Sequence, residues 1–294
     1  MNMVEITCVV DAGAELGEGP LWDPKAGVLW WIDIWKKLIH RYDPSTGKDE
    51  VFETPEYLGC LGLRQKGGLV LTMADGFHFF DPATGKFEAI VDPEAHMPKT
   101  RFNDGKPDRQ GRFWSGSMFE APGQLEFIGA LYRLDPDLSV HKMIDGIGCS
   151  NGLAWSPDSK TMYFSDSHAG AVWAYDFDPA TGDIENRRTF IDMTVTGGVA
   201  DGATVDAEGC YWVTIPVTSK VCRYDPTGRL MQTVVLPTDL PTCCEFGGKD
   251  LDILYVTSAV LRRPASHFVG QKHPGGLFAL DVGVKGLTLP AFKG

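Results

Sequence analysis

Hydrophobic and polar residues alternate with a period of two along most of this chain, which is the pattern of β-strands with one buried face. We find no ten-residue segment with the 3.6-residue period of an amphipathic helix. Six short runs of aromatic and β-branched residues are expected to form strands: residues 29–34, 69–73, 113–118, 161–166, 210–215 and 253–258. The pattern predicts an all-β protein.

A turn motif follows each of these runs. YDPSTGK (42–48) and FDPATGK (80–86) place proline after aspartate and glycine a few residues later, which favours a type I turn with a bulge. Related motifs stand at 134–140, 175–183, 224–230 and 280–286, so the sequence predicts six hairpins. Short outer strands are expected after five of them: Val51–Glu53, Phe87–Asp92, Val140–Ile144, Arg188–Ile191 and Met231–Leu236.

With a leading strand, each unit has four strands in roughly 45 to 50 residues, the period of β-propeller blades. The sixth unit lacks an outer strand, and the segment Val4–Asp11 has no unit of its own. We expect this N-terminal strand to complete the last blade, because closing the ring removes an exposed sheet edge. The predicted fold is a six-bladed β-propeller, four strands per blade, forming one domain over residues 1–294. The longer connections 120–127 and 260–273 are interpreted either as a lid over one face or as variable surface loops.

Four stretches of the sequence align position for position and carry an oxygen-bearing side chain five residues before a turn residue. The four side chains are Glu18, Asn103, Asn151 and Asp201. In a closed ring, equivalent residues at the start of innermost strands converge on one mouth. An oxygen-only set without histidine suits a hard cation such as Ca²⁺, Mg²⁺ or Mn²⁺. The alternative is that these side chains only hold turns.

Arg101 stands two residues before Asn103, so it is expected to face the same mouth. There it would hold a hydroxylated or carbonyl-bearing ligand, or else remain a surface arginine. P-loop and GxGxxG motifs are absent from the sequence.

Composition limits the partners. The formal net charge of −12 argues against nucleic acid and anionic membranes, and no run of about 18 apolar residues predicts a membrane span. The N-terminus lacks the features of a signal peptide. Seven cysteines without C-x-x-C spacing indicate free thiols in a reducing compartment, with Cys243 and Cys244 as small buried residues. We therefore expect a cytoplasmic protein, monomeric or weakly oligomeric.

Several segments in order resemble the senescence-marker-protein/gluconolactonase family: LGEGPLWDP (16–24), RFNDGKPDRQGRFW (101–114), SNGLAWSPD (150–158), ADGATVDAEG (200–209) and FGGKDLDILYVTSA (246–259). That family consists of six-bladed propellers. The resemblance implies that Glu18, Asn151 and Asp201 bind one divalent metal ion: Ca²⁺, or Zn²⁺, Mg²⁺, Mn²⁺ or Fe²⁺.

The resemblance also implies that Arg101 and Asn103 hold hydroxyls of the substrate and that Glu120 contacts it. Relatives of the regucalcin type carry two consecutive glutamates where this chain has Glu120 and Ala121. Since only one of the two is present, the substrate preference is expected to differ from theirs.

The reaction implied is hydrolysis of a sugar lactone, such as glucono-1,5-lactone, to its aldonic acid. The metal would polarise the carbonyl, and Asp201 would act as general base; a metal-bound hydroxide is the alternative base. Two other functions stay open: an ester or organophosphate hydrolase, and a calcium-binding, regucalcin-like or otherwise non-catalytic propeller. The expected partner is a small sugar lactone.

Overall fold

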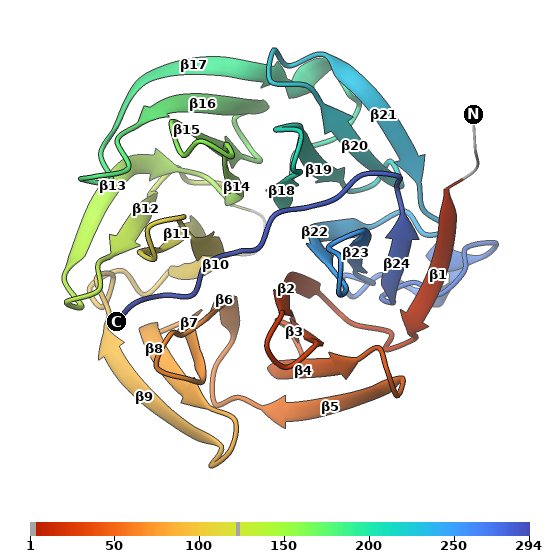
Figure 1. The fold of residues 1–294 in the computed structure, drawn as a ribbon, viewed down its shortest axis with the longest axis horizontal. Coiled ribbons are helices and arrows are strands. Elements are labelled where there is room, and N and C mark those ends of the chain that lie inside the picture. The colour runs from red at the N-terminus through yellow and green to blue at the C-terminus, as the bar shows by residue number, and fades with distance from the viewer. Residues whose placement is uncertain (1–3, 122–123) are drawn as a thin grey trace.

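The computed structural model describes residues 4–121 and 124–294, which form six four-stranded antiparallel sheets around a common centre (Figure 1). From the innermost strand outward, the first three blades are β2 (Gly17–Asp23), β3 (Val28–Asp33), β4 (Leu38–Asp43), β5 (Lys48–Glu53); β6 (Leu58–Leu63), β7 (Leu69–Met73), β8 (Gly76–Asp81), β9 (Lys86–Val91); β10 (Thr100–Pro107), β11 (Phe113–Phe119), β12 (Gly129–Leu134), β13 (Val140–Ile147). The other three are β14 (Ser150–Trp155), β15 (Thr161–Asp166), β16 (Ala171–Phe177), β17 (Ile184–Asp192); β18 (Ala203–Val205), β19 (Tyr211–Ile215), β20 (Lys220–Tyr224), β21 (Leu230–Val235); β22 (Pro241–Gly247), β23 (Ile253–Ser258), β24 (Leu277–Asp281), β1 (Glu5–Val10). Two short 3-10 helices, η1 (Met193–Val195) and η2 (Ala265–Phe268), lie in connections.

The prediction of a six-bladed all-β propeller with four strands per blade is confirmed. The six predicted aromatic strands are the second strands of the blades, with ends shifted by no more than one residue. Most of their residues are buried because both faces of each sheet pack against neighbouring blades. Between blades three and four, for example, Trp114, Trp155 and Phe177 form one aromatic cluster.

Five of the six predicted hairpins are present. In the first two, Gly47 and Gly85 take left-handed φ values of 72° and 70° and donate their N–H groups to the carbonyls of Asp43 and Asp81 at 2.8 Å. The sixth prediction is wrong, since the chain after Asp281 leaves the sheet and enters no outer strand. That motif, LDVGVKG, lacks the proline that fixes the first turn position in the others.

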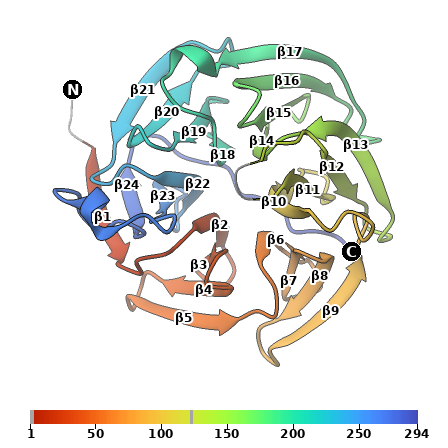
Figure 2. The ribbon, with the colours of Figure 1, turned by 180° about the vertical axis from the view of Figure 1, so that it is seen from behind.

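The N-terminal strand closes the ring as predicted. β1 pairs antiparallel with β24, with Cys8 opposite Phe278, and so becomes the outer strand of blade six. The innermost strands β2, β6, β10, β14, β18 and β22 each contact the innermost strands of the two neighbouring blades, and Figure 2 shows them surrounding the centre from the other side. The single domain over the whole chain stays a prediction.

The segment after β24 covers one end of the central space. It crosses the ring from blade six toward blades two and three (Figure 1). Gly286 pairs with Asp206, and Phe292 is fully buried with its N–H on the carbonyl of Leu63 at 2.8 Å. The first residues of the innermost strands lie at the opposite end, which we call the mouth.

The two predicted long connections both lie at the mouth, because each joins the second and third strands of its blade. The first, residues 120–127, includes Pro122 and Gly123, which are outside the described residues. The second, residues 260–273, contains η2. All seven cysteines are free, and Cys243 and Cys244 are buried as predicted. Among residues 4–121 and 124–294, no helix is long and apolar enough to cross a membrane.

Candidate active site at the channel mouth

Backbone bulges aim the predicted donors toward the centre. The register of β2 against β3 shifts between Glu18 and Leu21, and that of β14 against β15 shifts between Asn151 and Ala154. Bulges of this kind redirect side chains and are frequent beside active sites. Gly19 and Gly152, directly after the donors, adopt left-handed φ values of 51° and 66° that other residues reach only with strain.

Two buried aspartates hold the loops that lead into these donors. Asp33, at the end of β3, accepts hydrogen bonds from the N–H groups of Glu15 and Leu16 at 2.9 and 3.1 Å. Asp166, at the end of β15, accepts from the N–H groups of Gly148 and Cys149 at 2.8 and 3.0 Å. The approach to Glu18 and the approach to Asn151 are therefore fixed by the same device in blades one and four.

The residues five positions after the donors anchor the turns at the far end of the innermost strands. Asp108 accepts from the indole of Trp114 at 3.0 Å, and Asp206 accepts from that of Trp212 at 2.9 Å. The repeat seen in the sequence is thus a structural equivalence. The five residues between each donor and its turn residue correspond to one innermost strand, which runs from the mouth to the far turn.

Hydrogen bonds join the predicted amides into one network. Asn151 donates its Nδ2 to Ser167 Oγ at 2.8 Å, and Ser167 donates to the carbonyl of Ala200 at 2.7 Å, next to Asp201. Asn103 donates to the carbonyl of Ser150 at 2.9 Å and to Asn151 Oδ1 at 3.3 Å. Within this network Asn151 Oδ1 accepts one hydrogen bond and keeps a second lone pair for a further partner.

Arg101 is buried beside this network. Its Nη1 donates to Asn103 Oδ1 at 2.9 Å, and its Nε forms an ion pair with Glu120 Oε2 at 2.7 Å, without the alignment of a hydrogen bond. The guanidinium carbon lies 5.4 Å from the ring centre of Trp35. The guanidinium is thus held on three sides, as a group that positions a polar ligand would be. Trp35 was not predicted, because nothing in its local sequence distinguishes it from a core tryptophan.

Three carboxylates share the mouth. Burial, followed by the charges of Asp201 and Asp104, raises the pKa of Glu18 well above its usual range. Burial and the charge of Asp104 likewise raise the pKa of Asp201. Asp104 was not predicted, because the alignment of the four stretches places Asn103, and not its neighbour, at the donor position. Its carboxylate accepts from the N–H of Gly105 at 2.8 Å, and burial raises its pKa too.

The chemistry of this donor set fits a divalent cation. Glu18 is 9% exposed and, among residues 4–121 and 124–294, accepts a hydrogen bond only from the N–H of the adjacent Gly19, at 3.1 Å. Mutual repulsion among buried carboxylates is relieved when a cation lies among them. Near the corresponding positions, blades two and six carry the buried thiols of Cys60 and Cys243, and the carboxylate and amide donors come from the other four blades.

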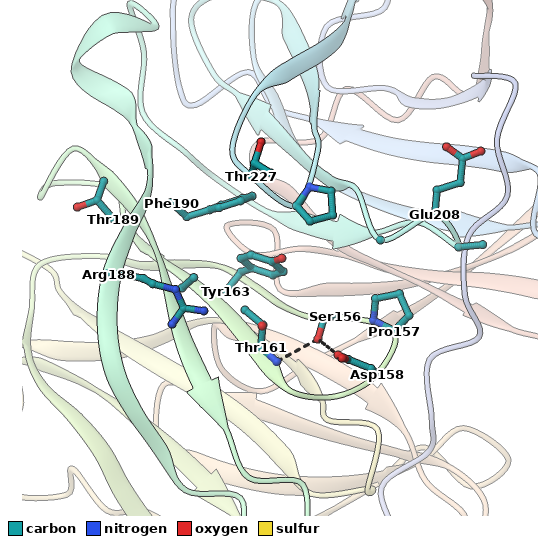
Figure 3. Close-up of a pocket in the computed structure, with 14 residues that line it drawn as sticks. Ser156, Pro157, Asp158, Thr161, Tyr163, Arg188, Thr189, Phe190, Glu208 and Thr227 are labelled. Atoms are coloured by element: carbon teal, nitrogen blue, oxygen red, sulfur yellow. Dashed lines mark hydrogen bonds between the residues drawn. The ribbon is translucent and has the colours of Figure 1, made fainter.

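A separate groove of about 610 Å³ lies at the far end, between blades four and five. Figure 3 shows its lining, in which Ser156 Oγ donates to Asp158 at 2.6 Å and accepts from the N–H of Thr161 at 3.0 Å. The hydroxyl of Ser156 thus makes hydrogen bonds within its own turn. None of the predicted site residues lines the groove. It therefore carries no chemistry for the mouth.

Comparison with known proteins identifies the family of this chain. The family model described as "SMP-30/Gluconolactonase/LRE-like region" matches residues 16–260. The chain belongs to this family. It is 39% identical to regucalcin of Xenopus laevis, with 100% of both chains covered. It is 35% identical to 6-deoxy-6-sulfogluconolactonase of Pseudomonas putida, over 98% of this chain and 99% of that protein.

Among solved structures, the chain is similar to a calcium-binding protein, regucalcin, of Agrobacterium tumefaciens. The TM-score is 0.93 and the sequence identity 29%, over 98% of this chain and 97% of that one. The family resemblance inferred from the motifs is confirmed. The roles of Glu18, Asn151 and Asp201, and of Arg101, Asn103 and Glu120, stay predictions; the contacts above bring these two sets together at one mouth.

Proposed function

We propose that this protein hydrolyses a sugar lactone, such as glucono-1,5-lactone, to the corresponding aldonic acid. The observation that carries the proposal is the group of buried carboxylates with raised pKa values, Glu18, Asp104 and Asp201, beside a fixed guanidinium at the mouth. The name of the Pseudomonas relative, a lactonase of a sulfonated sugar, supports the same class of reaction.

In this proposal Glu18, Asn151 and Asp201 hold one divalent metal ion. When bound, the metal supplies a positive charge that polarises the lactone carbonyl and stabilises the negative charge developing on its oxygen. Oxygen-only donors suit Ca²⁺, Mg²⁺ or Mn²⁺ best. The description of the Agrobacterium relative as calcium-binding supports a divalent ion at this site.

Asp201 serves as the general base. Its carboxylate removes a proton from the attacking water, whose oxygen then bonds to the carbonyl carbon. The ring C–O bond breaks, and the ring oxygen takes up a proton to become a hydroxyl. Burial and the charge of Asp104 raise the pKa of Asp201, whereas a bound cation lowers it, so one oxygen of Asp201 would bind the metal and the other would take the proton.

Arg101 orients the sugar. Its remaining N–H groups can donate to a hydroxyl or ring oxygen of the sugar, while Asn103 and Glu120 keep the guanidinium in place. The amide of Asn103 makes hydrogen bonds with Arg101, Ser150 and Asn151, so it contributes to substrate binding mainly by positioning these neighbours. Glu120 is partly exposed and is free to exchange its ion pair for a substrate hydroxyl.

The test is proton release from glucono-1,5-lactone in weak buffer. Metal-stripped protein is assayed first, and Ca²⁺, Mg²⁺, Mn²⁺, Zn²⁺ or Fe²⁺ is then added back. Hydrolysis well above the spontaneous rate, dependent on a metal, supports the proposal and ranks the cations. A flat response with every cation, on a panel of sugar lactones, contradicts it.

One observation favours a second function, non-catalytic calcium binding. The oxygen-only donor set is suited to Ca²⁺ whether or not a reaction follows. The same experiment separates the two, since calorimetric binding of Ca²⁺ without hydrolysis of any lactone would favour the binding protein. A cytoplasmic location and a monomeric or weakly oligomeric state stay predictions.

A further inference from the structure

Three metal-ligating side chains meet where the ring closes, away from the mouth carboxylates. Cys8 lies in β1, Asp11 follows that strand, and His273 precedes β24. Each offers one ligand atom, and these atoms all lie within 4.8 Å of one another. In the described part of the chain, no other group of three His, Cys, Asp or Glu residues has its ligand atoms this close together. We call it the closure cluster.

The closure cluster is held by both of the segments that carry it. His273 Nδ1 and Asp11 Oδ2 are 2.9 Å apart. The N–H of Ala14 donates to the carbonyl of Gly275 at 2.8 Å, which ties the segment after Asp11 to the one after His273. A Cβ at Gly276 would lie 3.0 Å from Cys8 Sγ, so the glycine leaves room for the sulfur.

The chemistry of the closure cluster differs from that of the mouth. Sulfur, imidazole nitrogen and carboxylate oxygen together suit Zn²⁺ and ions that replace it, such as Co²⁺, and suit Ca²⁺ poorly. A catalytic cysteine is the competing interpretation of a Cys, His and Asp group. The zinc interpretation is favoured because the three ligand atoms lie within 4.8 Å of one another and come from the two segments that close the ring.

We propose that Cys8, Asp11 and His273 form a zinc site that fastens the N-terminal strand to the last blade. Three protein ligands leave a fourth position open to solvent. The ion would link two segments whose cysteine and histidine are 265 residues apart in sequence (273 − 8), at the seam where the propeller would otherwise open. The site is independent of the proposed lactonase activity.

Titration of the metal-free protein with Co²⁺ tests this proposal. A thiolate ligand gives a sulfur-to-cobalt charge-transfer band in the near ultraviolet, which oxygen ligands at the mouth do not give. The band should appear in the wild type and be lost in Cys8→Ser. In His273→Ala, Co²⁺ affinity should fall at least about tenfold, the lower bound seen even for residues that only support metal ligands.

His141→Ala is the matched control. His141 is paired with Asp135 at 3.1 Å and its side chain is 46% exposed, as is that of His273, but it belongs to no group with a cysteine. The control should leave the band and the affinity unchanged. The proposal is overturned if the wild type shows no band, or if the band survives in Cys8→Ser, which would assign it to another thiol such as Cys149.

Thermal unfolding gives a second readout that does not depend on colour. Added Zn²⁺ should raise the Tm of the wild type more than that of Cys8→Ser, because only the former keeps the thiolate ligand. An equal rise in both proteins would place all of the stabilising zinc elsewhere and overturn the proposal.

Discussion

A buried ion pair spans the ring below the mouth. Lys106 comes from β10 of blade three and Glu245 from β22 of blade six, which face each other across the centre (Figure 1). Lys106 Nζ lies 3.0 Å from Glu245 Oε2 and donates to the carbonyl of Ala203 at 2.6 Å. Burial is the largest single effect and lowers the pKa of Lys106, but the interactions with Glu245, Cys243 and Asp104 together outweigh it and raise that pKa. The pair thus stays charged and joins opposite blades.

Replacing Lys106 with methionine should strongly destabilise the fold. Glu245 is 1% exposed, so it would be left as a buried charge that accepts hydrogen bonds from the hydroxyl of Thr204 and the N–H of Phe246, at 2.8 and 2.9 Å. Removing one partner of a buried pair typically costs about 3 to 5 kcal/mol. The double variant Lys106→Met, Glu245→Gln removes both charges and should lose less than the single variant.

Urea unfolding measures these free energies. Circular dichroism and tryptophan fluorescence must give coincident transitions, so that a single free energy of unfolding is defined. Lys142→Met is the control, because Lys142 and Asp145 are also 3.0 Å apart but are 51% and 69% exposed; its effect should stay within about 0.5 kcal/mol. The reasoning is refuted if Lys106→Met costs less than about 1 kcal/mol, the range of surface pairs, or if the double variant loses more than the single one.

Three further predictions concern the mouth. Glu18→Gln should weaken metal binding measured by calorimetry, and unchanged affinity would remove Glu18 from the ligand set. Arg101→Lys cannot keep the geometry of the guanidinium on Asn103, so kcat/KM for the lactone should fall about tenfold or more; an unchanged value would exclude Arg101 from substrate positioning. Gly152→Ala should destabilise the fold more than Gly19→Ala, by about 1 to 3 kcal/mol. Both glycines have left-handed φ values, but only at position 152 would a Cβ lie 2.6 Å from the buried hydroxyl of Tyr211. Equal losses in urea unfolding would contradict this.

The strands and turns could be predicted because their signals are local. The aromatic runs, the Asp-Pro turns and the orphan segment Val4–Asp11 each encode their own conformation within a few residues. The spacing of Glu18 and Asp201 from their turns could be interpreted for the same reason, since one innermost strand separates the mouth from the far turn.

Other features depend on which segments the closed ring brings together. Nothing near Lys106 indicates that its partner stands 139 residues away on the opposite blade. Asp104 lies outside the aligned donor positions, and its role in the site is visible only in the fold, where it is buried and its charge acts on Glu18. Likewise, the crossing of the far end by residues 285–293 follows from contacts with blades two, three, five and six that no local pattern encodes.

The most direct test of the central claim is the rate of lactone hydrolysis by Asp201→Asn at saturating metal. The variant keeps the shape of the side chain but loses the proton acceptor, and general base catalysis typically contributes about 10²- to 10⁴-fold. We predict a rate below about a tenth of the wild type, a loss of more than roughly 1.4 kcal/mol in transition-state stabilisation, with circular dichroism and Tm unchanged. A folded variant that retains more than about a tenth of the wild-type rate would rule out Asp201 as the base.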